Sequence, residues 1–243
     1  MPETVKILGV DIHKINMEES LLQIKKWIEK NSFSHMVFTP NAEMTVKAHD
    51  DPAFRRILNG ADLRVPDGAG ILLASRLLGS PVQERVAGFD LLVKLCQLAH
   101  KKDYTAFFLG AKPGIAKKAA ESINRRGKSA PIVGYHHGYL DHDEKVKAIE
   151  EINKLSPDIL FVGMGVPLQE KFVHKNLHKL NVRVAVTIGG SFDVLAGEVK
   201  RAPTFMQKMG MEWFYRLLQE PQRLGRMMAL PRFILLILKE KYF

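Results

Sequence analysis

The sequence predicts an α/β protein: a mostly parallel, Rossmann-like sheet with helices on both faces, followed by a helical appendage that binds membrane. Short runs that are almost wholly apolar alternate with longer segments of helical periodicity. This alternation is typical of parallel strands that are buried on both sides. Polar residues and glycines follow most of these runs, and the strand pattern stops before the last segment of the chain.

Seven apolar runs are predicted to be strands, and they are bounded mostly by Gly, Pro, Asn and Asp, the residues that favour turns. They lie from Val5 onward and at 35–40, 63–67, 104–110, 131–138, 158–165 and 183–190. Helical patterns separate them, at 19–30, 42–58, 89–101, 113–126, 144–155 and 169–180. In a sheet of this kind, ligands bind beyond the carboxyl ends of the strands.

Composition narrows the possibilities without choosing a function. The chain has 243 residues, enough for one large domain or two small ones, and its single cysteine, Cys96, excludes an intramolecular disulfide. One cysteine also fits a reducing compartment. The first residues lack the apolar block of a signal peptide, so no export is implied. A net charge of +10 attracts phosphates, whether in nucleic acid, nucleotides or anionic lipid.

The segment 205–243, here called the C-terminal appendage, carries seven Lys/Arg and three Glu among aromatic residues, methionines and the run FILLIL. That run is far shorter than the about 20 apolar residues that cross a bilayer. We expect new helices to begin at Pro221 and Pro231. Two alternatives stay open: a helix in the membrane interface, or a helix pair that packs on the domain. An exposed apolar appendage also predicts a homo-oligomer.

Polar residues at the predicted strand ends form the candidate site. Taken singly, each is most simply a helix N-cap, because Ser, Thr, Asp and Asn accept hydrogen bonds from free amide groups. Together at one edge of a sheet they predict a polar crevice. Asp67, in PDG, is a candidate general base, and Arg85 could pair with a carboxylate or a phosphate. The other strand-end residues are Thr39, Asn41, Gln169, Gly189 and Asp193.

Two further motifs have ordinary structural explanations. Glycine turns at 109–114 and 163–167 could bind phosphate through backbone amides, but their spacing is not that of a dinucleotide fingerprint. Asp141 and Glu144 have the spacing of a capping box. We therefore predict no metal site and no cofactor.

Several long blocks occur together in order: FTPNAEM, ADLRVPDGAGI, RVAGFDLL, FFLGAKPG, FVGMGVPLQEKF and GGSFDVLAGEVKRAP. With them, the chain resembles the WecG/TagA/CpsF glycosyltransferase family over nearly its whole length. Since the strand pattern ends before the appendage, we expect the catalytic domain at 1–204. The resemblance implies transfer of N-acetylmannosamine from UDP-N-acetylmannosamine. The acceptor would be N-acetylglucosamine on undecaprenyl diphosphate, at the cytoplasmic face of the cell membrane. The implied product is a β-1,4 linkage, formed with inversion, in the linkage unit of wall teichoic acid.

The resemblance also assigns roles. Asp67 matches the family's catalytic base, Thr39 and Asn41 would hold the sugar or the acceptor hydroxyls, and Gln169 is a further catalytic candidate in the crevice. The residues expected to hold UDP are Gly110, Gly134, Tyr139, Gly189 and Asp193. Without a metal, arginine is the natural group to neutralise a leaving diphosphate, because its fork binds phosphate at two points. The candidates are Arg85 and, if the appendage folds over the crevice, Arg216, Arg223 and Arg226.

Two alternatives remain beside this assignment. One is transfer of a different sugar by the same family. The other is a nucleic-acid-binding α/β module. Two observations argue against that module: the basic residues are spread along the sequence, and no recognition motif occurs. We therefore expect no nucleic-acid partner.

Overall fold

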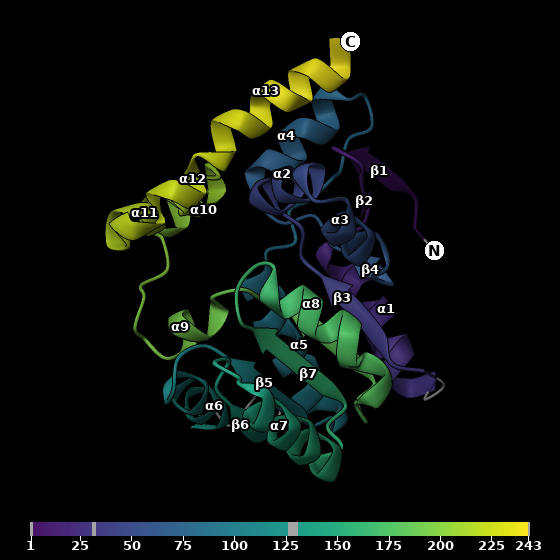
Figure 1. Ribbon diagram of the computed structural model, residues 1–243, viewed down its shortest axis with the longest axis vertical. Helices are drawn as coiled ribbons and strands as arrows, with labels where there is room; N and C mark the ends of the chain where they lie inside the picture. Colours follow the sequence, from purple (N-terminus) through teal and green to yellow (C-terminus); the bar gives the residue numbers. More distant parts are fainter. Residues whose placement is uncertain (1, 31–32, 126–130, 243) are drawn as a thin grey trace.

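In the computed structural model, which describes residues 2–30, 33–125 and 131–242, a parallel sheet lies between two layers of helices (Figure 1). Its strand order is β4-β3-β8-β7-β5-β6, and each neighbouring pair is parallel. The α/β class and the parallel sheet are thus confirmed. The strands are β3 (His35–Phe38), β4 (Leu63–Arg64), β5 (Ala106–Gly110), β6 (Ile132–His136), β7 (Ile159–Gly163) and β8 (Val184–Thr187).

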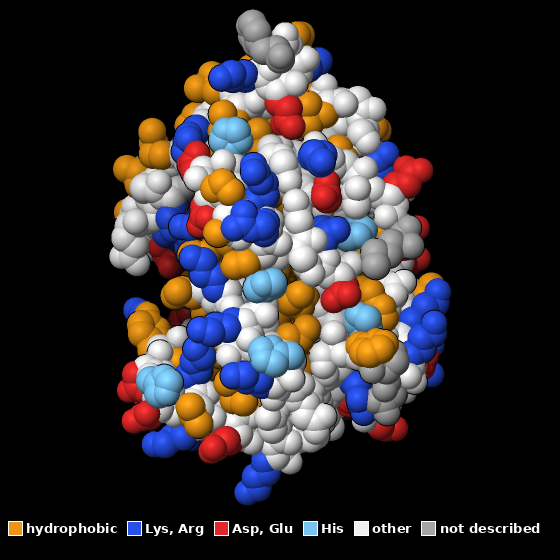
Figure 2. All heavy atoms as spheres, turned by 45° about the vertical axis from the view of Figure 1, so that its right-hand side comes forward, with side chains coloured by type: hydrophobic (Ala, Val, Ile, Leu, Met, Phe, Trp, Pro, Cys, Tyr) orange, Lys and Arg blue, Asp and Glu red, His pale blue; other side chains and the backbone are white. Residues whose placement is uncertain are grey.

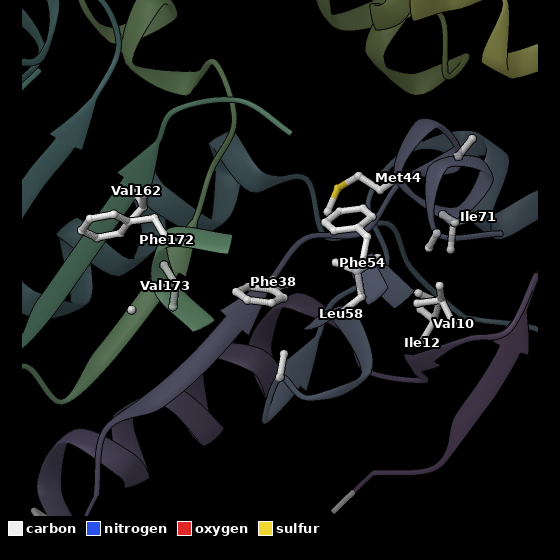
Figure 3. Close-up of a cluster of buried hydrophobic side chains, with 14 of the residues drawn as sticks. Val10, Ile12, Phe38, Met44, Phe54, Leu58, Ile71, Val162, Phe172 and Val173 are labelled. Carbon is white, nitrogen blue, oxygen red and sulfur yellow. The ribbon is translucent and has the colours of Figure 1, made fainter. Parts of the chain in front are cut away.

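Each central strand contributes to two cores, because successive side chains point to opposite faces of a sheet. Phe107 and Leu109 of β5 enter one core, whereas Ala106 and Phe108 enter the other. The first core is covered by α3 (Pro52–Asn59), α7 (His142–Leu155) and α8 (Leu168–Asn176), and the second by α1 (Met17–Lys30), α5 (Gly88–Lys102), α6 (Ile115–Arg125) and α9 (Ser191–Leu195). Figure 3 shows part of the first core, where Phe172 lies close to Val162.

The prediction of a single N-terminal strand in the main sheet was wrong. Residues from Thr4 onward form an antiparallel hairpin of β1 (Thr4–Ile7) and β2 (Val10–His13), which is a sheet of its own. The turn residues Leu8 and Gly9 have φ of 49° and 81°. Two positive φ values match the tight hairpin turn that usually has Asn-Gly, so a Leu in that turn hid the reversal in the sequence.

The predicted helix 42–58 is two helices, α2 (Ala42–Asp50) and α3. Asp51 separates them: its carboxylate accepts hydrogen bonds from the N–H groups of Ala53 (2.9 Å) and Phe54 (3.0 Å), and Pro52 begins the new helix. Asp at the N-cap and Pro at the first position both favour a helix start.

Two short helices were not expected, α4 (Ala69–Leu77) and α9. Their N-cap residues are Gly68 and Gly190, and neither has a side-chain cap hydrogen bond. Their starts therefore lack the polar signal on which sequence-based assignment depends.

The other predicted helices are confirmed with small shifts at their ends. The predicted helix 169–180 is α8 followed by one 3₁₀ turn, Leu177–Lys179. The predicted helix 113–126 corresponds to α6, and its last predicted residue lies outside the described part of the chain. At the start of α7, Asp141 Oδ1 accepts a hydrogen bond from the Glu144 N–H at 2.8 Å, and the Glu144 carboxylate accepts one from the Asp141 N–H. The predicted capping box is therefore confirmed.

Strand order places a switch point between β5 and β7. The chain leaves β5 through α6 toward the edge strand β6, and leaves β7 through α8 in the opposite direction, toward β8. The ends of β5 and β7 run so close that a Cβ on Gly110 would collide with the backbone of Gly163. Crevices for ligands open at such points in parallel sheets.

The C-terminal appendage is mostly helical over its described length, with short breaks between its elements. Its elements are α10 (Thr204–Lys208), α11 (Glu212–Gln219), a 3₁₀ turn (Pro221–Arg223), α12 (Leu224–Met227) and α13 (Ala229–Tyr242). Helix α13 lies along α2 and α4 (Figure 1), with Phe233 and Ile237 buried and Leu235 exposed. Pro221 begins an element as predicted. Pro231 does not, because it lies inside the first turn of α13, where a proline is tolerated.

Two surface properties follow. Within the described residues, no helix is both long enough and apolar enough to cross a bilayer. Lys and Arg side chains are spread over the face in Figure 2, among acidic, apolar and His side chains, and form no continuous basic surface there.

Candidate active site

The carboxyl ends of the strands open into one cleft of about 1330 Å³, closed on its other side by α11, α12 and α13. Most residues that the sequence singled out line it, although they come from distant parts of the chain. They are Thr39, Asn41, Asp67, Arg85, Tyr139, Gln169, Gly189, Asp193, Arg216, Arg223 and Arg226. The expected crevice at the sheet edge is therefore present.

Two predicted residues do not line the cleft. Gly134 lies in the middle of β6, where an added Cβ would come within 2.5 Å of the Phe107 ring and 2.7 Å of Leu155 Cδ1. Its missing side chain serves packing and not a ligand. Gly110 is the last residue of β5, and the next residue, Ala111, lines the cleft in its place.

Asp67 is held by backbone contacts at the floor of the cleft. Its N–H donates to Pro40 O at 3.1 Å, and its Oδ2 accepts from the N–H of Gly88, the first residue of α5, at 3.4 Å. It does not cap the helix that follows it, whose N-cap is Gly68. Burial raises the pKa of Asp67 to about 6, against the opposing effects of the Arg85 charge and the Gly88 N–H. Asp67 is therefore ionised at neutral pH and accepts a proton more readily than an ordinary carboxylate.

Thr39 and Asn41 converge on the same region from the loop after β3. Thr39 donates its hydroxyl hydrogen to Thr187 O at 3.2 Å. A Cβ built on Gly88 would lie 3.5 Å from Thr39 Oγ1 and 3.8 Å from Asp67 Oδ2, so both side chains border this glycine. Asn41 accepts from the Met44 N–H at 3.0 Å and caps α2 while it lines the cleft. The cap and crevice explanations hold together for Asn41.

Arg85 connects the acid to the C-terminal appendage. Its Nε lies 3.9 Å from Asp67 Oδ1, and its Nη2 donates to Glu212 of α11. Glu212 also accepts from Arg201 at 3.3 Å, and Arg201 makes two 2.7 Å hydrogen bonds to Asp90 at the start of α5. A continuous chain of charges thus joins both sides of the cleft.

Three of the four arginines of the appendage line the same cleft, and one of them, Arg216, lies beside Gly190 and Asp193. Arg216 bonds Glu220 at 2.8 Å and lies 3.9 Å from Asp193, and Arg223 approaches the same Glu220 at 3.5 Å. Arg226 makes two hydrogen bonds to Glu43 of α2, at 2.8 and 3.0 Å. Burial and the like charges of Arg216 and Arg226 lower the pKa of Arg223. An anion placed among these guanidinium groups would be stabilised.

Gln169 lies in the first turn of α8, facing the ends of β7 and β8. Its side chain is buried, and its Oε1 accepts from the Gly189 N–H at 3.1 Å.

Burial raises the pKa of Asp193, another residue of the cleft, and the nearby Arg216 opposes this shift. Tyr139, after β6, is exposed at the rim. Among the described residues, there is no group of three or more His, Cys, Asp or Glu side chains that could hold a metal ion.

The acids that hold the arginines in place were not predicted from the sequence. Glu212, Glu220 and Glu43 each bond an arginine of the cleft. Glu220 lies four residues after Arg216, a spacing that favours an ion pair on one helix face and was a usable signal. Glu212 and Arg85 are 127 residues apart, so no local pattern predicts their contact.

Comparison with known proteins assigns the chain to a family. Residues 5–243 match the family described as glycosyl transferase WecG/TagA/CpsF. A protein of Bacillus spizizenii named N-acetylglucosaminyldiphosphoundecaprenol N-acetyl-beta-D-mannosaminyltransferase is 38% identical over 88% of this chain and 82% of its own length. Proteins with the same name from Bacillus subtilis and Staphylococcus aureus are 33% and 32% identical, each over 98% of this chain and 93% of their own lengths. The match to the family over nearly the whole chain and the cleft at the carboxyl edge of the sheet lead to one conclusion: this protein belongs to the WecG/TagA/CpsF glycosyltransferase family.

Proposed function

We propose that this chain is an inverting N-acetylmannosaminyltransferase. It would move N-acetylmannosamine from UDP-N-acetylmannosamine to the 4-hydroxyl of N-acetylglucosamine on undecaprenyl diphosphate, in synthesis of the wall teichoic acid linkage unit. The names of the relatives support this choice of donor and acceptor. The observation that carries the proposal is one cleft that holds a carboxylate with a raised pKa, Asp67, together with Arg216, Arg223 and Arg226 of the appendage.

In the proposed reaction, Asp67 is the general base. The acceptor oxygen forms a bond to the anomeric carbon while the bond from that carbon to the diphosphate oxygen breaks. The hydroxyl proton passes to Asp67, and UDP leaves with the bonding electrons from the opposite face of the sugar, which inverts the anomeric carbon. Arg85, 3.9 Å from Asp67, favours its ionised form. Thr39 and Asn41, beside the base, would hold the hydroxyls of the two sugars.

The donor would lie across the switch point, with its diphosphate toward the appendage. Arg216 lies against the backbone of Gly190, where an added Cβ would come within 2.5 Å of its Nη2. With Arg223 and Arg226 it would neutralise the charge that develops on the leaving diphosphate, without a metal or another cofactor. Gly189, Asp193 and Tyr139 line the same part of the cleft and are the proposed contacts to UDP.

We propose that the chain has two parts with different roles. The domain at 1–204 carries out catalysis, and the appendage, 205–243, holds the enzyme on the inner face of the cell membrane. Helix α13 supports this, because it buries Phe233 and Ile237 but exposes Leu235, Leu238 and Tyr242 beside Lys239 and Lys241. An amphipathic basic helix of this kind binds anionic interfaces. We propose that a homo-oligomer covers part of this surface away from the membrane.

The direct test is UDP release from a panel of UDP-sugars with a short-chain N-acetylglucosaminyl diphospholipid, with and without EDTA. We expect UDP-N-acetylmannosamine to give the highest kcat/KM and EDTA to have no effect. A higher kcat/KM with another UDP-sugar would contradict the proposed donor but would still agree with sugar transfer by this family. Loss of transfer in EDTA would contradict the role given to the arginines.

A further inference from the structure

A second buried acid lies behind the cleft, and the proposed chemistry does not use it. Glu170 follows Gln169 in α8, and its side chain has no exposed surface. A buried carboxyl group destabilises a fold unless hydrogen bonds or an opposite charge compensate it. Among the described residues, no Lys, Arg or His forms a salt bridge with Glu170. Only hydrogen bonds can therefore compensate the burial of this acid.

The hydrogen bonds of Glu170 fix the orientation of the Gln169 amide. Gln169 Nε2 donates to Glu170 Oε1 at 2.6 Å, and Gln169 Oε1 accepts from the Gly189 N–H at 3.1 Å. Exchanging the two ends of the amide would set two N–H donors against each other at Gly189. A primary amide has two N–H donors, and Glu170 takes one of them. The other remains for a partner, and Gln169 lines the cleft.

The far oxygen of Glu170 faces the strand that supports Thr39. Glu170 Oε2 and Thr187 Oγ1 are both buried, and neither has a hydrogen-bond partner in the described part of the chain. A proton on Oε2 donated to the Thr187 hydroxyl, or the Thr187 hydroxyl hydrogen donated to Oε2, would satisfy both atoms. Burial raises the pKa of Glu170 to about 7, while the bond from Gln169 and the Thr187 hydroxyl oppose the shift. Glu43, the nearby charged group, raises the pKa further and is itself paired with Arg226.

We propose that Glu170 is a positioning residue for sugar transfer: its buried carboxyl group holds the Gln169 amide so that the second Gln169 N–H points at the bound sugar nucleotide or acceptor. The expected effect of Glu170 on turnover rests on the proposed function. Glu170 itself does not line the cleft, whereas Gln169 does. Its effect must therefore pass through Gln169, and a double-mutant cycle can detect this.

The cycle compares Glu170→Ala, Gln169→Ala and the double variant by UDP release, with Lys171→Ala, at an exposed neighbour, as the control. We expect Glu170→Ala to lower kcat at least tenfold, Lys171→Ala to stay within twofold, and Glu170→Ala to add less than twofold in the Gln169→Ala background. Glu170→Gln, which keeps an acceptor for Gln169 and a donor for Thr187, should stay within threefold of wild type. An undiminished effect of Glu170→Ala without Gln169, or a Glu170→Gln variant as impaired as Glu170→Ala, would overturn the proposal.

A second measurement judges the proposal without any substrate. In ¹⁵N-labelled protein, the side-chain NH₂ signal of Gln169 is assigned by its loss in Gln169→Ala. We expect two well-separated proton shifts in wild type and shifts of a free glutamine side chain in Glu170→Ala. Glu170→Met, which fills a similar volume without an acceptor, replaces Glu170→Ala if that variant does not fold. An unchanged Gln169 signal would overturn the proposal, even if the wild-type chain transferred no N-acetylmannosamine and the proposed function itself had failed.

Discussion

The Nε atom of Arg85 lies 3.9 Å from Asp67 Oδ1. The far end of the same guanidinium is bonded to Glu212 of α11. The candidate base is thereby connected to the C-terminal appendage through a single side chain. A movement of α11 would move the Arg85 charge relative to Asp67. The position of the appendage therefore affects how easily Asp67 accepts a proton.

Asp67→Asn should stabilise the fold while it removes the base. The pKa of Asp67 is raised from 3.8 to about 6 in the folded chain, so folding favours its protonated form. The ionised carboxylate therefore lowers the free energy of unfolding above pH 6, and this penalty fades as pH falls toward 3.8. With the remaining exposure of the side chain and the Arg85 contact taken into account, we expect a gain of roughly 1–2 kcal/mol at pH 8. Urea unfolding at pH 8 and pH 4 checks this, and an equal gain at both would contradict it.

Two glycine substitutions should have opposite effects. Gly134→Ala places a methyl group 2.5 Å from the Phe107 ring, away from the cleft, and should cost about 1–3 kcal/mol of stability with kcat/KM of the folded fraction unchanged. Gly190→Ala places a methyl group 2.5 Å from Arg216 Nη2, so it should displace the arginine and raise KM for the donor severalfold at near-normal stability. Thermal unfolding and steady-state kinetics on both variants separate the two roles. A loss of activity in Gly134→Ala without a loss of stability would restore its predicted place in the donor site.

The two faces of α13 should separate folding from membrane binding. Phe233 is 1% exposed, and Phe233→Ala should cost about 3 kcal/mol or more by cavity formation. Leu235 is 68% exposed, and Leu235→Ala should change stability by less than about 0.5 kcal/mol. If the exposed face enters the interface, Leu235→Ala should weaken binding to vesicles of anionic phospholipid. Unchanged vesicle sedimentation would remove this face from the membrane contact.

Two arginines of the appendage offer a matched pair. Arg226 bonds Glu43 and lines the cleft, whereas Arg232 bonds Asp50 outside it, and each makes two hydrogen bonds to its acid. Arg226→Ala should lower kcat/KM at least tenfold, because a charge is lost beside the leaving diphosphate. Arg232→Ala should stay within twofold. Equal effects of both substitutions on turnover would mean that the appendage arginines act only through docking.

The main sheet was predictable because its central strands β5, β7 and β8 are buried on both faces and therefore consist almost wholly of apolar residues. Asp67 was found for a related reason: a polar residue directly after such a strand lies at the carboxyl edge, where ligands bind. The turn at Leu8 and the uncapped start of α4 were not predictable, because each lacks the residue that usually marks such a turn or helix start.

The strand-end residues of the site and the arginines of the appendage were named from the sequence, but the acids that bond these arginines were not. Gly134 illustrates the error of assigning glycines by position alone, since the ring of Phe107 and not a ligand occupies the space beside it. The partners of the arginines were missed because contacts such as Arg226 with Glu43 join residues 183 positions apart. Long-range ion pairs depend on how the appendage docks, and no local periodicity records this.

The most direct test of the central claim is UDP release by wild type and Asp67→Asn between pH 5 and 8, with UDP-N-acetylmannosamine and the diphospholipid acceptor. Because the base must be ionised and its pKa is about 6, wild-type kcat/KM should rise with pH through that value. Asp67→Asn should be slower by about 10²–10⁴-fold and lack this rise. Turnover of Asp67→Asn close to that of wild type would contradict the assignment of Asp67 as the base.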